Sequence, residues 1–150
     1  MDDKFPEEKA IRLARENFWK GFHCSEAILI AMAEYIGVTS ELIPKIATGF
    51  GGGIASSGLI CGALVGGVMV IGIKYGRTSP EENPQPVWDL MDNYVAAFKE
   101  KFGAVNCRQL TRLNLKTEKG LQQYFARVHD YECTERLKFA VEKAAEILSK

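Results

Sequence analysis

The sequence predicts an all-α fold, a single-domain bundle of several helices around a central, glycine-rich apolar helix. Apolar residues recur mostly every three or four positions, alternating strand-like segments are scarce, and no linker or internal repeat divides the chain. The chain has 150 residues, 47% of them apolar, which is enough to form one core without disulfide bonds. We therefore expect residues 1–150 to form one helical domain that carries four cysteines.

The first part of the chain predicts three helices. Residues 6–20 place apolar side chains on one stripe behind a proline and an acidic first turn, and Gly21 ends this helix. Residues 24–36 are apolar on nearly every side, as expected of an internal helix. Residues 39–47 predict a shorter helix, which Pro44 limits or kinks.

The second half of the chain predicts four more helices. Residues 76–86 contain three prolines and indicate a surface loop. Helical spacing then continues through residues 87–102, which a glycine closes, and through short helices at 106–113 and 121–128. The last helix is the clearest, because residues 137–148 keep their apolar side chains on one face.

Residues 59–73 form the most apolar segment of the chain. They end a longer stretch without charge, 46–73, but glycines and serines fill its first part. The 15-residue apolar run makes about 22 Å of helix, less than the roughly 30 Å of a bilayer core, so we expect a buried central helix and no membrane span. Gly58, Gly62 and Gly66 lie four positions apart and predict a smooth ridge for close packing.

The charge of the chain limits its partners and its compartment. Nineteen lysines and arginines balance nineteen aspartates and glutamates, so no excess positive field is available to bind nucleic acid. Residues 1–10 are acidic and polar, the reverse of a secretory signal, and we expect a cytoplasmic protein. Cysteines in that compartment are reduced, so they are catalytic, metal-binding, redox-active or buried.

Each cysteine falls near a predicted helix start, and none shows C-x-x-C spacing. Cys24 begins a helix, Ser57 or Gly58 can start the helix that carries Cys61, and Cys107 follows an asparagine cap. Cys133 lies in the first turn of a helix that Asp130 can cap. The free N–H groups and the dipole at a helix start favour a thiolate, which predicts lowered pKa values. The alternative is four buried cysteines that act as small apolar side chains.

Both histidines of the chain neighbour cysteines. His23 adjoins Cys24, and His129 precedes Cys133 by four positions. Either imidazole would stabilise a thiolate or accept a proton. The alternative is that both histidines face solvent in loops.

The cysteines and their surroundings resemble a known family. The segments are "HCSEAIL" around Cys24, "CGALVG" from Cys61, "NCRQL" around Cys107, and Cys133 near the C-terminal helix. Their order resembles the redox-active protein family named for its C-GCAxxG-C-C cysteine pattern, and the resemblance spans the chain from Cys24 to its end. It implies a small helical bacterial or archaeal protein, often associated with transporter loci. Related domains occur in proteins that carry an iron–sulfur cluster, but the resemblance establishes no reaction.

We therefore expect the four cysteines to converge in one partly accessible site, with Cys61 at its centre. The predicted site consists of the redox-active thiols and their supporting residues: Cys24, Cys61, Cys107, Cys133, His23, His129, Gly62 and Gly66. The thiols either cycle between dithiol and disulfide with an unknown redox partner, or hold a [2Fe–2S] cluster or a zinc ion. The rival hypothesis is a non-catalytic bundle that docks on a transporter or on a second copy of itself.

Overall fold

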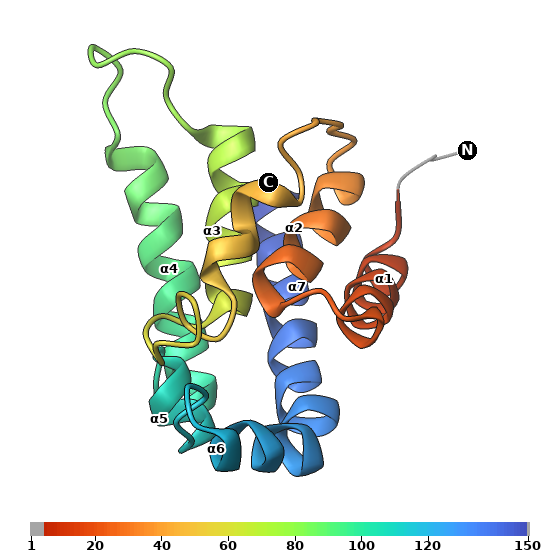
Figure 1. Ribbon diagram of the computed structural model, residues 1–150. Coiled ribbons are helices and arrows are strands. Elements are labelled where there is room, and N and C mark those ends of the chain that lie inside the picture. Colours follow the sequence, from red (N-terminus) through yellow and green to blue (C-terminus); the bar gives the residue numbers. More distant parts are fainter. Residues whose placement is uncertain (1–4, 150) are drawn as a thin grey trace.

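The computed structural model describes residues 5–149, and 69% of these residues are helical (Figure 1). Within this part of the chain, β pairing is limited to one isolated bridge between Ile60 and Asn106. The prediction of an all-α fold is therefore confirmed. The expectation of a cytoplasmic protein rested on residues 1–10, and residues 1–4 of that segment lie outside the described residues.

Five long helices form the body of the molecule. They are α1 (Glu7–Lys20), α2 (Cys24–Tyr35), α3 (Gly62–Tyr75), α4 (Gln85–Phe102) and α7 (Thr134–Leu148). Four shorter elements lie between them: the 3₁₀ helix η1 (Lys45–Phe50), α5 (Cys107–Thr111), α6 (Glu118–Gln123) and the π-helix η2 (Tyr124–Cys133). The predicted surface loop joins α3 to α4, and left-handed glycines at 21 and 103 end α1 and α4 as predicted.

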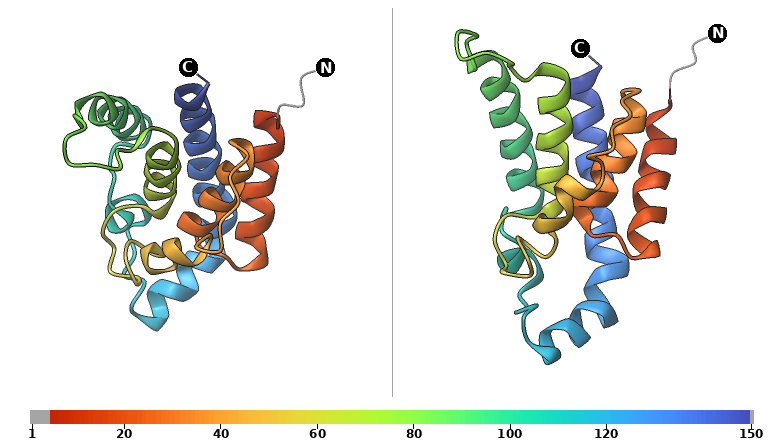
Figure 2. Two further views of the ribbon diagram at one scale, coloured as in Figure 1. Left: turned by 90° about the horizontal axis from the view of Figure 1, so that it is seen from above. Right: turned by 45° about the horizontal axis from the view of Figure 1, so that its top comes forward.

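Helix α7 has contacts with α1, α2, α3 and α4, whereas α3 packs on α2, α4 and α7 (Figures 1 and 2). The structure does not confirm α3 as the central helix. Its C-terminal part reaches the surface, where Ile73 is 44% exposed. Helix α7 carries alanines on its buried face, and their small size lets several helices approach it closely.

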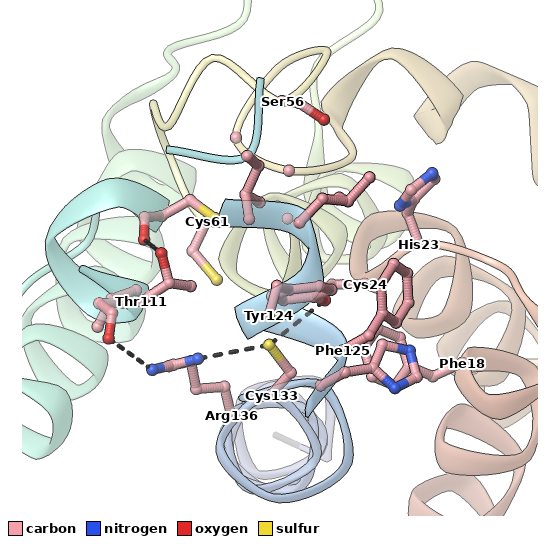
Figure 3. A pocket seen from close by; sticks show the side chains of 18 of the residues that line it. Phe18, His23, Cys24, Ser56, Cys61, Thr111, Tyr124, Phe125, Cys133 and Arg136 are labelled. Carbon is pink, nitrogen blue, oxygen red and sulfur yellow. Dashed lines mark hydrogen bonds between the residues drawn. The ribbon is translucent and has the colours of Figure 1, made fainter. Parts of the chain in front are cut away.

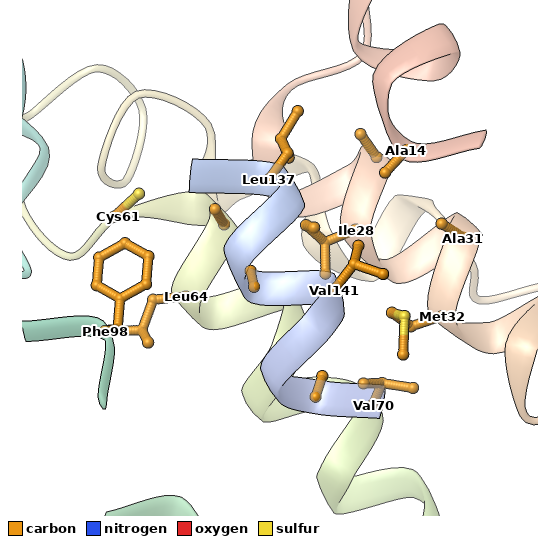
Figure 4. Close-up of a cluster of buried hydrophobic side chains, with 14 of the residues drawn as sticks. Ala14, Ile28, Ala31, Met32, Cys61, Leu64, Val70, Phe98, Leu137 and Val141 are labelled. Carbon is orange, nitrogen blue, oxygen red and sulfur yellow. The ribbon is translucent and has the colours of Figure 1, made fainter. Parts of the chain in front are cut away.

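The core lies between α7 and the long helices around it (Figure 4). Leu137 and Val141 of α7 are fully buried, as are Ile28 of α2 and Leu64 of α3. Full burial of such an aliphatic side chain stabilises the fold by about 1.5–3 kcal/mol. Cys61 lies at the edge of this cluster, so the core and the candidate site share a wall.

Two glycines of α3 allow α2 to approach closely. A Cβ atom on Gly62 would lie 3.0 Å from the Ser25 nitrogen, and one on Gly66 would lie 2.7 Å from the Ile28 Cβ atom. The predicted glycine ridge is therefore present at these two positions. Gly58 does not belong to it, because it precedes the helix and adopts a left-handed φ of 73°.

Two predicted helices differ from the observed ones. In place of the helix predicted over residues 39–47, residues 41–44 form turns and the 3₁₀ helix η1 begins only after Pro44, because a proline disfavours α conformation in the residue before it. The predicted break between residues 121–128 and the last helix is absent, since α6, η2 and α7 follow one another without a gap. None of the helices in residues 5–149 has the length and apolar character needed to cross a membrane.

Candidate functional site

A cavity of about 130 Å³ is lined by all four cysteines. Figure 3 labels three of them, Cys24, Cys61 and Cys133. The four cysteines come from segments far apart in the sequence, so the fold brings them together as predicted. All four are free thiols. Cys61 and Cys133 are each only 5% exposed, so the thiols are accessible mainly through the cavity.

The start of α2 is fixed by a buried carboxylate. Cys24 is the first residue of the helix, and Glu26 in the same turn accepts a hydrogen bond from the backbone N–H of His23 at 2.9 Å. The second oxygen of Glu26 accepts one from the Thr48 hydroxyl, also at 2.9 Å. These bonds join the helix start to η1 and hold Cys24 in the cavity wall.

A short antiparallel contact places Cys61 beside Cys107. The N–H of Cys61 donates to the carbonyl of Val105 at 2.8 Å, and that of Cys107 donates to the carbonyl of Leu59 at 2.6 Å. The isolated bridge lies between these two bonds. Cys61 then caps α3, and Cys107 opens α5. Both residues thus have the predicted position at a helix start.

Cys133 has a different backbone setting from the other three cysteines. It is the last residue of the π-helix η2 and leads directly into α7, with helical φ and ψ of −67° and −37°. The prediction of a helix start here, capped by Asp130, is therefore wrong. The helix continues through this point, so no free helix N-terminus faces the Cys133 sulfur.

The π-helix brings Tyr124 to Cys133. The tyrosine hydroxyl lies 3.6 Å from the cysteine Sγ, although the two residues are nine positions apart. Nine residues of α-helix make two and a half turns, at 3.6 residues per turn, and would place them on opposite faces. The i→i+5 bonding of a π-helix widens the turn, so nine residues make about two turns and share a face.

Arg136 is the charged residue next to Cys133. It is 94% buried, with 6% exposure, and its Nη1 donates to the Cys133 Sγ at 3.5 Å. Its Nη2 donates to the Leu110 carbonyl at 3.0 Å and to the Glu132 carboxylate at 3.3 Å. The Nε–H is buried and has no hydrogen-bond partner among the residues that the structure describes. The guanidinium is thus fixed beside the sulfur and keeps one free donor.

These neighbours favour the thiolate of Cys133. A hydrogen bond from the Cys24 thiol is the largest cause that lowers the pKa of Cys133, and the charge of Arg136 and the Tyr124 hydroxyl add to it. Together they outweigh burial and bring this pKa to about 7. The same bond, with burial next, raises the pKa of Cys24 well above its usual range. The pair therefore shares one proton, which resides on Cys24.

Burial decides the ionisation of the other two cysteines. It raises the pKa of Cys61, although backbone N–H groups at the start of α3 oppose the shift. It raises the pKa of Cys107 to about 12, and the nearby Cys61 adds to this. The prediction that a helix start lowers the pKa is therefore wrong for Cys61 and Cys107, where burial is the largest cause of the raised pKa. It is also wrong for Cys24, where the interaction with Cys133 comes first and burial second.

The two histidines lie in the cavity wall without bonding to a sulfur. His129 is hydrogen-bonded to Asp130, with 2.8 Å between its Nδ1 atom and the carboxylate oxygen. Its ring stacks on Phe18 with centroids 4.1 Å apart. His23 packs its ring against the backbone of Gly51. Their predicted roles at the thiols stay predictions, and the contacts indicate an aromatic wall.

The donor arrangement does not fit a metal ion as it stands. In the described part of the chain, no three His, Cys, Asp or Glu side chains are grouped as an ion would require. Four-coordinate zinc and a [2Fe–2S] cluster both need such a group.

Sequence reasoning missed Arg136 and Tyr124. Arg136 follows Cys133 by three positions, and this spacing places two side chains on the same helix face, so the signal was available. Tyr124 carries no such signal, because only the π-helix brings it to Cys133. Its buried hydroxyl has a raised pKa, which keeps it protonated and able to donate.

Comparison with known proteins identifies the family. The family described as "Putative redox-active protein (C_GCAxxG_C_C)" matches residues 22–147. An uncharacterized protein from Archaeoglobus fulgidus is 31% identical over 112 residues, which cover 69% of this chain and 74% of the relative. No solved structure matches the chain significantly.

Proposed function

Because the chain belongs to the redox-active C_GCAxxG_C_C family, we propose that it works by thiol–disulfide chemistry at one pair, Cys24 and Cys133. The observation that carries this proposal is the setting of Cys133: it shares a cavity wall with Cys24, and its Sγ lies 3.5 Å from Arg136 Nη1 and 3.6 Å from the Tyr124 hydroxyl. The thiolate is the attacking species in such chemistry, and an attacking thiol is most effective when its pKa lies near the ambient pH. Cys133 meets this condition at neutral pH.

The cycle begins with the attack of the Cys133 thiolate on a small disulfide. A bond forms between Cys133 and one sulfur of the disulfide, and the other sulfur leaves as a thiolate. Cys24 then loses its proton to solvent and attacks the Cys133 sulfur, which releases the second thiolate. The two protein thiols are oxidised to one disulfide, and the small disulfide is reduced to two thiols.

Disulfide mapping tests the pair. We would treat the reduced protein with hydroxyethyl disulfide, block free thiols, and identify linked peptides by mass spectrometry. We expect a Cys24–Cys133 link, its loss in Cys133→Ser, and its retention in Cys107→Ser, which alters another cysteine of the same cavity. A link between Cys61 and Cys107, with Cys24 and Cys133 left reduced, would overturn the proposal, as would the absence of any disulfide.

A further inference from the structure

The cavity beside Cys133 has features that select the oxidant. Its volume of about 130 Å³ is close to the roughly 150 Å³ of an engineered cavity that holds benzene. It therefore accepts a molecule of about six heavy atoms. Cys133 is 5% exposed and lies within this wall, so a disulfide on the surface of a folded protein does not reach it.

The walls of the cavity are mostly apolar. Phe18 and Tyr124 line the inner part of the cavity. Three further apolar residues of the lining are partly exposed to solvent: Phe22 (36%), Leu121 (42%) and Phe125 (58%). Apolar residues exposed together at a cavity favour an apolar ligand, since each buried methylene of a ligand contributes about 0.8 kcal/mol. The reacting group must therefore be carried by a short hydrocarbon.

The polar groups around the Cys133 sulfur are donors. Arg136 Nη1 donates to Sγ at 3.5 Å, and the Tyr124 hydroxyl, which accepts from the Cys133 thiol at 3.6 Å, can donate to the sulfur once the thiol is ionised (Figure 3). Within residues 5–149 the Nε–H of Arg136 is buried without a partner. Oxygen accepts hydrogen bonds strongly and sulfur weakly, so these donors stabilise a leaving alkoxide far better than a leaving thiolate. An unused donor next to the nucleophile is typical of a site that binds developing negative charge on oxygen.

We propose that the physiological oxidant of this site is a small organic hydroperoxide, ROOH, with a short apolar R group. This inference rests on the proposed Cys24–Cys133 pair. The Cys133 thiolate attacks the terminal oxygen, the O–O bond breaks, and Cys133 becomes a sulfenic acid while RO⁻ leaves toward Arg136 and takes a proton from solvent. The Cys24 thiol then attacks the sulfenic sulfur and releases water. In total, the Cys133 thiolate, the Cys24 thiol, ROOH and one proton from solvent give the Cys24–Cys133 disulfide, ROH and water.

Single-turnover kinetics test this inference. We would mix the reduced chain with tert-butyl hydroperoxide, hydrogen peroxide or hydroxyethyl disulfide, and measure the rate of Cys24–Cys133 formation. Each rate would be divided by that of free cysteine, corrected for its thiolate fraction. We expect an acceleration of ~100-fold or more for tert-butyl hydroperoxide, the size of effect that one well-placed donor supplies. Hydrogen peroxide should show at least ~10-fold less, because it lacks the apolar group.

Two variants separate the donors from the thiolate itself. Arg136→Lys keeps the charge and loses the Nε–H, and Tyr124→Phe keeps the ring and loses the hydroxyl. Both should slow the hydroperoxide reaction at least ~10-fold more than the disulfide reaction. Arg108→Gln changes an exposed arginine outside the cavity lining and should leave both rates unchanged. Circular dichroism would check that each variant is folded.

The outcomes distinguish the two proposals. Disulfide formation with hydroxyethyl disulfide but no acceleration with either peroxide would overturn the inference and leave the redox pair standing. Faster reaction with hydrogen peroxide than with tert-butyl hydroperoxide would overturn the organic substrate class. Equal slowing of all three oxidants by the variants would overturn the role of the donors toward oxygen. Failure of all three oxidants to form the Cys24–Cys133 disulfide would overturn both proposals.

Discussion

Cys133 and Cys107 line the same cavity, and burial disfavours the thiolate of both. Beside Cys133 stand a thiol donor, a guanidinium and a phenol, and its pKa falls to about 7. Beside Cys107 stands another buried cysteine, and its pKa rises to about 12. Cys107 has the helix start and Cys133 does not, so side-chain neighbours decide which thiol ionises.

Removal of Arg136 should reduce the difference in reactivity between Cys133 and Cys107. In Arg136→Met the Cys133 thiolate loses a charge-assisted hydrogen bond worth about 1.5–3 kcal/mol, so alkylation of Cys133 at pH 7 should slow at least ~10-fold. Peptide-resolved mass spectrometry with iodoacetamide measures the rate. At pH 10 the difference should shrink, because the thiol then ionises in both proteins.

Arg108→Gln is the matched control, since Arg108 is an exposed arginine beside Cys107. Its Cys133 alkylation rate should equal that of the unchanged protein. An Arg136→Met variant that is folded and reacts as fast as the control would show that the guanidinium does not activate Cys133.

More of the fold than of the site could be predicted from the sequence. Helices α1 and α4 were predictable because each has an apolar stripe and a glycine at its end. The convergence of the four cysteines was predicted from their shared placement near helix starts and from the family resemblance, which runs from Cys24 to the end of the chain. The place of Cys61 at the centre of the site stays a prediction, whereas the contacts of Tyr124 and Arg136 with Cys133 were not predicted.

The reasons for that miss are physical. The π-helix has no simple sequence signal, and an α-helical reading of residues 121–128 separates Tyr124 from Cys133. Burial was the second unknown quantity, because a helix start predicts a low pKa only for a thiol that keeps some contact with solvent. The pKa values of the three cysteines at helix starts are instead raised, by burial or by interaction with another cysteine.

A smaller effect should follow from changing the α2–α3 contact, which holds Cys24 toward Cys133. In Gly66→Ala the new methyl would lie 2.7 Å from the Ile28 Cβ and 3.0 Å from the Ser25 carbonyl oxygen. Overpacking of this kind costs about 1–3 kcal/mol and should shift α2, which weakens the Cys24 bond to Cys133. Urea unfolding measures the first effect, and the alkylation rate of Cys133 measures the second.

Gly72→Ala is the control in the same helix, because nothing lies within 4 Å of the added methyl. It should be neutral or stabilising by up to about 1 kcal/mol, since alanine is the better helix former. Equal stability of the two variants would show that the close approach of α2 to Gly66 is not needed.

The dependence of stability on pH should separate the two cysteines by sign. Between pH 7 and the ordinary cysteine value of 9.0, Cys133 has lost its proton in the folded chain and keeps it in the unfolded chain, so its contribution rises with pH. Between pH 9.0 and about 12, Cys107 keeps its proton only in the folded chain, so its contribution falls as pH rises. Each slope is at most about 1.4 kcal/mol per pH unit. Urea unfolding at pH 7, 8, 9 and 10 should therefore give a flatter rise up to pH 9 in Cys133→Ala and a flatter fall above pH 9 in Cys107→Ala. If both variants instead followed the pH dependence of the unchanged protein, the two thiols would share one ordinary pKa and their neighbours would not tell them apart.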